Sequence, residues 1–121
     1  MTARRRWLTG GALLGALLMT AGCASGPTVL EAARESCEAG RLGDEGHTLV
    51  LDMAGEDEGS GDLSYLEVIC VLGELDAPDA MLDKLGSTRS LDGRQSDDWN
   101  GIEASWSYHP ASGLDLILEV G

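Results

Sequence analysis

Residues 102–120 read IEASWSYHPASGLDLILEV and carry the clearest structural pattern in the chain. Apolar and polar residues alternate on both sides of a five-residue turn, His109 to Gly113. A period of two is typical of strands that bury one face, and two such runs joined by a short turn form a β-hairpin. The stretch therefore predicts a hairpin with one apolar face at the end of the chain.

The same alternation occurs once earlier, from His47 to Met53, and predicts a further strand. Between this strand and the hairpin, residues 78–86 begin with a proline and end with a glycine, which is typical of a helix. Its apolar stripe, expected in the core, consists of Met81, Leu82 and Leu85. We expect a turn over residues 41–46 and a short strand over residues 88–91.

A helix is predicted from residue 29 to about residue 39. Thr28 and Glu31 are spaced as a capping box at its start, and Gly40 is suited to end it. The apolar residues that recur at helical spacing, and are expected to face inward, are Val29, Ala32, Ala33 and Cys37.

Residues 63–75 form the most apolar segment after the first quarter of the chain. The spacing of Ser64 and Glu67 again fits a capping box, whereas β-branched residues at 68, 69 and 71 keep a buried strand as an alternative. Length and capping favour a helix. The residues expected on its inner face are Leu63, Leu66, Cys70 and Gly73, with Ile69 beside them.

These elements predict an α+β fold. We expect two or three helices packed on one face of an antiparallel sheet of three to four strands, with the hairpin last. Residues 28–121 would form this single small domain, after a linker over residues 23–27. The acidic, glycine-rich segment 55–62 does not have the spacing of an EF-hand, so we expect a solvated, mobile loop and no metal.

The N-terminus has the three-part pattern of a secretory signal. Arg4, Arg5 and Arg6 precede an apolar, uncharged run from Trp7 to Met19. As a helix this run would span about 20 Å, too short for a hydrocarbon core that needs roughly 20 residues. A cleaved signal peptide over residues 1–22 is therefore favoured over a permanent transmembrane helix.

The residues that follow, Thr20-Ala21-Gly22-Cys23, resemble a bacterial lipobox. The resemblance implies cleavage before Cys23 and transfer of a diacylglyceryl group to its thiol, and two acyl chains anchor a protein stably. The alternative is an ordinary secretory signal in which the cysteine is incidental. Residues 4–8, RRRWL, also resemble a twin-arginine motif, so the export route stays open.

The two remaining cysteines, Cys37 and Cys70, are expected to form one disulfide, because exported domains fold in an oxidising compartment. Two buried free thiols are the alternative. Without its signal the chain has 21 acidic and five basic residues, a net charge of −16. Such a surface repels nucleic acid and anionic headgroups, so we expect no nucleic-acid partner.

No nucleophile elbow, zinc motif or phosphate-binding loop occurs in the sequence. We therefore expect a membrane-anchored, extracytoplasmic lipoprotein that acts as a binding or interaction module of unknown ligand. A protein of the cell envelope is a candidate partner, and no cofactor is expected. The expected binding surface consists of Asp92, Arg94, Trp99 and His109, although a core position for Trp99 is equally expected.

The alternative function is that of a small hydrolase that uses carboxylates among Asp92, Asp97, Asp98 and Glu103. The segment from Leu91 to Pro110, which begins LDGRQ and ends WSYHP, resembles a motif of small lipoproteins of high-GC Gram-positive bacteria, a group to which no activity is assigned.

Overall fold

The computed structural model describes residues 26–121, so the predicted signal peptide, the lipobox and Cys23 lie outside the described residues. Within these described residues, five strands, three α-helices and two short 3₁₀ helices follow one another. In order they are α1 (Val29–Cys37), β1 (Arg41–Gly43), η1 (Asp44–Gly46), β2 (Thr48–Asp52), α2 (Tyr65–Glu74), α3 (Asp79–Gly86), η2 (Ser90–Asp92), β3 (Gln95–Trp99), β4 (Ile102–His109) and β5 (Gly113–Val120).

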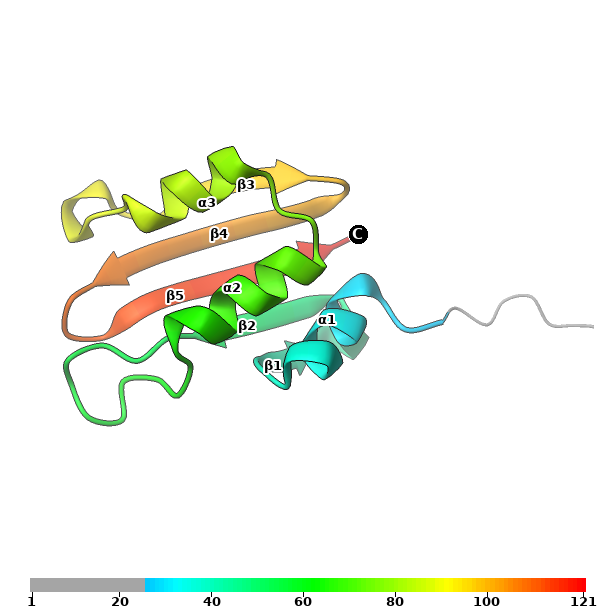
Figure 1. Cartoon of the computed structure of the whole chain (residues 1–121), viewed down its shortest axis with the longest axis horizontal. Helices are drawn as coiled ribbons and strands as arrows, with labels where there is room; N and C mark the ends of the chain where they lie inside the picture. The colour runs from blue at the N-terminus through cyan, green and yellow to red at the C-terminus, as the bar shows by residue number, and fades with distance from the viewer. Residues whose placement is uncertain (1–25) are drawn as a thin grey trace, which may run out of the picture.

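The strands form one antiparallel sheet in the order β1-β2-β5-β4-β3, and the three helices cover one of its faces (Figure 1). The α+β prediction is confirmed, with five strands instead of three or four. The predicted hairpin is the pair β4–β5 at the centre of the sheet, where Trp106 lies opposite Leu116 and Ala104 opposite Leu118.

The alternation of apolar and polar residues does not predict two of the strands. β1 has only three residues and lies where a turn was predicted. β3 reads Gln-Ser-Asp-Asp-Trp and buries only Trp99. Both are edge strands, and short, charged edges are common because they discourage pairing with other chains. The strand predicted over residues 88–91 is wrong, since Ser90–Asp92 forms the 3₁₀ helix η2.

The core lies between the sheet and the helices. Trp106 is the largest fully buried side chain, and its indole Nε1 donates a 2.8 Å hydrogen bond to the Thr88 hydroxyl. The indole thereby joins β4 to the segment after α3. Other fully buried side chains from both layers are Leu30, Leu49, Leu51, Val68, Val71, Leu72, Met81, Leu116 and Leu118.

Residues 65–74 are helical, as favoured over the strand alternative, but the helix is rotated relative to the prediction. The buried side chains are Val68, Val71 and Leu72, whereas Leu66 is 79% exposed. The segment is apolar on most sides, so spacing alone does not select the buried face. In α1 the buried residues are Leu30 and Ala33, whereas Val29 is more than half exposed.

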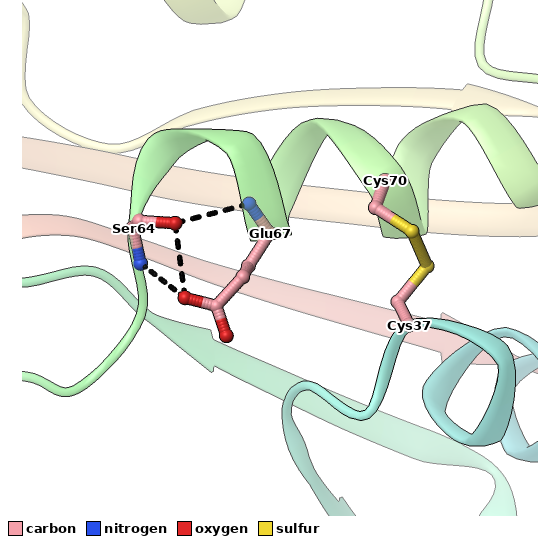
Figure 2. Close-up of a disulfide and its surroundings, with 4 residues drawn as sticks. All are labelled: Cys37, Ser64, Glu67 and Cys70. Carbon is pink, nitrogen blue, oxygen red and sulfur yellow. Dashed lines mark hydrogen bonds between the residues drawn. A yellow bond between two sulfur atoms is a disulfide. The ribbon is translucent and has the colours of Figure 1, made fainter.

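The predicted disulfide is present and joins the last residue of α1 to the middle of α2 (Figure 2). Cys37 and Cys70 have their Cα atoms 5.9 Å apart, a usual separation for a disulfide. The bond lies beside the core rather than within it, because Cys70 is exposed and Cys37 is half-buried. It fixes α1 against α2 from the side.

Both predicted capping boxes are present, and the second is drawn in Figure 2. The Ser64 hydroxyl accepts from the Glu67 N–H, while the Ser64 N–H donates to the Glu67 carboxylate at 2.9 Å. The bond from the Ser64 N–H, followed by that from its hydroxyl, lowers the pKa of Glu67. A lowered pKa stabilises the fold above the unfolded pKa, and this contribution is lost as the pH falls through the folded pKa.

Replacing Ser64 by alanine is expected to lower the free energy of unfolding by about 1 kcal/mol, because it removes the side-chain cap of α2. The pKa of Glu67 should rise toward its ordinary value, since one of its two hydrogen-bond donors is lost. Urea unfolding measures the first effect and an NMR titration of Glu67 the second. Ser36→Ala, on the exposed side of α1, is the control and should change neither. An unchanged Glu67 titration in Ser64→Ala would contradict the capping geometry.

Candidate functional site

The four residues of the expected binding surface do not form one site. Asp92 lies in η2 and pairs with Arg89, whose Nη2 donates at 2.9 Å. The bond from the Arg89 side chain, and then that from the Arg89 backbone N–H, lower the pKa of Asp92. Arg94 lies on the sheet face that no helix covers, where its Nη1 donates to Asp115 at 3.4 Å. Both charges are therefore neutralised within the chain.

Trp99 and His109 lie at opposite ends of the sheet. Trp99 pairs with Ile102 at the start of β4, and His109 is the last residue of that strand. Trp99 is only 8% exposed and its Nε1 donates a 2.8 Å hydrogen bond to the Leu75 carbonyl. The expectation of an exposed tryptophan anchor is therefore wrong, and the core position is correct. His109 is exposed, and its Nδ1 accepts from the Ala111 N–H within the turn.

Apart from Asp92, the carboxylates of the hydrolase alternative are divided between the two faces of the sheet. Asp97 points toward α3, where Lys84 donates to it at 3.1 Å. The backbone N–H of Asp98, followed by Lys84, lowers the pKa of Asp97. Asp98 and Glu103 lie on the other face. A general acid requires a raised pKa, whereas the pKa of Asp97 is lowered.

The sheet face without helices carries three carboxylates in a line, here called the acid row. Glu119 of β5 lies opposite Glu103 of β4, which lies opposite Asp98 of β3. Within residues 26–121 none of the three takes part in an ion pair. Like charges directly opposite one another on neighbouring strands destabilise a sheet. The acid row is therefore a site of local repulsion.

Replacing Glu103, the central residue of the acid row, by glutamine is expected to raise the free energy of unfolding by roughly 0.5 kcal/mol at low salt, because it removes both repulsive contacts. The gain should shrink as salt screens the charges. Urea unfolding at two salt concentrations measures it. Glu35→Gln on the exposed side of α1 makes the same change in net charge. An equal gain in that control would show that overall charge, and not the row, is responsible.

A groove lies on the helical side of the sheet, between the start of α2 and the end of α3, and is here called the apolar groove. No charged residue lines it. Tyr65 and Leu85 come from the two helices, and Tyr108 and Leu114 come from the paired strands β4 and β5 below them. Met53, Gly86 and Thr88 complete the lining. The sequence contains little signal for this groove, because Leu85 reads as ordinary core and Tyr65 follows a helix cap.

The acidic loop 55–62 packs against the β4–β5 turn. The backbone N–H groups of Glu56 and Asp57 donate to the carbonyls of Pro110 and Ala111, each at 2.9 Å. Gly113 has φ +85°, and any Cβ there would collide with the backbone of Met53. The predicted loop is therefore seated on the turn through main-chain contacts. Within residues 26–121, no three His, Cys, Asp or Glu side chains converge to hold a metal ion.

None of the helices described for residues 26–121 has the length and apolar character needed to cross a bilayer. No protein-family model, no curated protein and no solved structure matches the chain.

Proposed function

We propose that this protein is an extracytoplasmic lipoprotein, anchored through a diacylglyceryl group on Cys23, that acts as a binding module in the cell envelope. The observation that carries the proposal is the order of Arg4–Arg6, a short apolar run and the sequence Thr20–Cys23. The disulfide between Cys37 and Cys70 supports it, because such bonds persist in oxidising compartments outside the cytosol.

The anchor would determine which end of the domain faces the membrane. Only Ala24 and Ser25 separate Cys23 from the first described residue, Gly26, so the tether reaches at most roughly 10 Å. The chain enters beside the start of α1, and Gly121 lies at the same end of the sheet (Figure 1). The β4–β5 turn and the acidic loop lie at the opposite end, which would point away from the bilayer.

A binding function is favoured over catalysis because several charged side chains of the domain are already paired with one another. Asp92, Asp97 and Arg94 pair with groups of the same chain, and the perturbed carboxyls have lowered pKa values. The apolar groove, by contrast, is uncharged and open to solvent. Concave, mostly apolar sites with a few polar groups commonly bind ligands through shape and apolar contact.

Expression of the full chain in a bacterium with lipoprotein-processing enzymes tests the anchor. The wild-type protein should incorporate labelled palmitate and partition into the detergent phase, since two acyl chains hold a protein stably in a membrane. Cys23→Ser should lose both properties, whereas a Cys37→Ala, Cys70→Ala double variant should remain labelled. Palmitate incorporation that survives Cys23→Ser would refute lipidation at this residue.

A further inference from the structure

The sheet face that no helix covers carries its side chains in rows that cross the strands. The acid row is the first of them. Two residues further along each strand, and therefore pointing the same way, Val50 of β2 lies opposite Ile117 of β5, which lies opposite Ser105 of β4. The row after that contains Asp52 opposite Asp115. An uncharged middle row thus runs between two rows that contain carboxylates.

A hollow of about 360 Å³ lies on this face, and its lining includes Ser96, Ser105 and all three carboxylates of the acid row. Ser96 lies opposite Ser105 in the middle row. Serine side chains are short, so the middle row is low at this point, with the longer side chains of the acid row beside it. The hollow therefore has a small, uncharged floor and carboxylates along one side.

Arg94 lies on the same face, but its charge is directed away from the acid row. Its Nη1 donates to the Asp115 carboxylate at 3.4 Å, and its Nη2 donates to the Ser105 hydroxyl at 3.2 Å. Within residues 26–121 the acid row has no ion pair of its own, so the repulsion between its members persists. Proteins break such local rules mainly at functional or strained sites. The acid row is therefore a candidate for contact with a cationic partner.

Val50 and Ile117 supply an apolar contact on the same face. Both side chains are half-buried, on the face opposite to the one that the helices cover (Figure 1). Ile117 lies opposite Ser105, which lines the hollow. Apolar contact and negative charge therefore lie in neighbouring rows. At protein interfaces the first contributes affinity, and the second favours the encounter and specifies the partner.

The charge of this face determines which partner fits it. Besides the acid row, the face carries Asp52 and Asp115, against Arg41 and Arg94. A second copy docked face to face would bring two acid rows together, and anionic lipid would be repelled in the same way. A basic protein segment has the complementary charge and would relieve the repulsion within the row. This choice rests on the proposed binding function, but not on the lipid at Cys23.

We propose that the sheet face without helices docks a basic protein segment. Cationic side chains of the segment enter the hollow and pair with the acid row, which has no competing cation within residues 26–121. An apolar side chain of the segment packs on Val50 and Ile117. The apolar contact fixes the position of the segment on the sheet, and the charges favour the encounter.

The test uses the full processed protein in nanodiscs of zwitterionic lipid, with empty nanodiscs as the blank. Two fluorescent peptides of equal Lys and Arg content are titrated, one with a central valine pair and the other with serines in those places. The valine peptide should bind more tightly. Glu103→Gln with Glu119→Gln should weaken its binding roughly fivefold, because two exposed ion pairs are lost. Added salt should weaken the binding of the wild type.

Two matched controls separate the docking face from general effects. Glu35→Gln with Glu58→Gln makes the same change in net charge at exposed positions in α1 and the acidic loop, and should leave binding unchanged. Ile117→Thr keeps a β-branched residue in β5 and should weaken the valine peptide but not the serine peptide, whereas Val29→Thr, on exposed α1 surface, should change neither. Urea unfolding checks that each variant is folded, and the charge variants test the proposal independently of Ile117→Thr.

Three results would overturn the proposal. They are equal binding of the two peptides, an equal loss in the Glu35 and Glu58 control, and no binding of the valine peptide at roughly millimolar concentration. Repeating the titration with Cys23→Ser protein in buffer separates this proposal from the anchor. Peptide binding that persists there supports the docking face whether or not Cys23 carries lipid, and its loss there would contradict docking by the sheet face alone.

Discussion

Replacing Cys37 and Cys70 together by alanine is expected to lower the free energy of unfolding by roughly 3–4 kcal/mol. The disulfide closes a loop with a sequence separation of 33, and a loop of this length removes about that much chain entropy from the unfolded state. Small domains are stable by only about 5–15 kcal/mol, so the variant would retain a marginal fold. The midpoint of thermal unfolding should fall by roughly 15–25 °C.

Calorimetry of the variant and of the wild type, with and without a reducing agent, measures this effect. Reduction of the wild type should reproduce the loss, whereas the double variant should not respond to the reducing agent. Cys23→Ser is the control, since it removes a cysteine that is not part of the bond. A loss below about 1 kcal/mol would mean that α1 and α2 stay packed without the covalent link.

Replacing Trp106 by alanine is expected to cost roughly 3–5 kcal/mol, the range for truncating a buried aromatic residue. Its side chain is 1% exposed and lies at the centre of the sheet, opposite Leu116. The substitution empties the space between the sheet and the helices and also leaves the Thr88 hydroxyl without its indole donor. Urea unfolding monitored by circular dichroism measures the loss.

Thr88→Val separates the hydrogen bond from the packing at Trp106. It removes the acceptor of the indole Nε1 and the bond from the Thr88 hydroxyl to the Lys84 carbonyl, but it keeps the shape of the side chain. It should cost about 1 kcal/mol. Trp106→Ala should therefore be several times more costly than Thr88→Val. Equal losses in the two variants would show that the polar contact, and not the filling of the core, is the main contribution of this tryptophan.

The parts of the fold that the sequence predicts are those governed by local rules. The β4–β5 hairpin follows from strict alternation, because both strands are central and bury one face. The starts of α1 and α2 follow from the Thr28 and Ser64 capping boxes, which depend on residues only three apart. The disulfide follows from the cysteine count and the predicted export, without knowledge of the fold.

The edge strand β3 is an element that the alternation of apolar and polar residues does not predict. Its polar sequence gives no such signal, yet Asn100-Gly101 directly after it is a strong hairpin signature. Both residues have positive φ, 47° and 79°, as the two central positions of a type I′ turn require. This dipeptide could have identified the β3–β4 hairpin, and with it the buried position of Trp99 at the end of β3.

The candidate site was harder to predict, because it depends on how separate elements pack. The rotation of α2 decides that Leu66 points to solvent, and no local pattern distinguishes the apolar sides of this helix. The pairing of Asp92 with Arg89 and of Arg94 with Asp115 removes charges that appear free in the sequence. The apolar groove exists only because α2 and α3 meet the sheet with space between them.

The most direct test of the account is the mass of the mature protein, purified from membranes and measured intact and after proteolysis. We expect a chain that begins at Cys23, carries a diacylglyceryl group on that residue, and has lost two hydrogens to the Cys37–Cys70 bond. A chain that still begins at Met1, or an unmodified cysteine at position 23, would contradict the lipoprotein assignment.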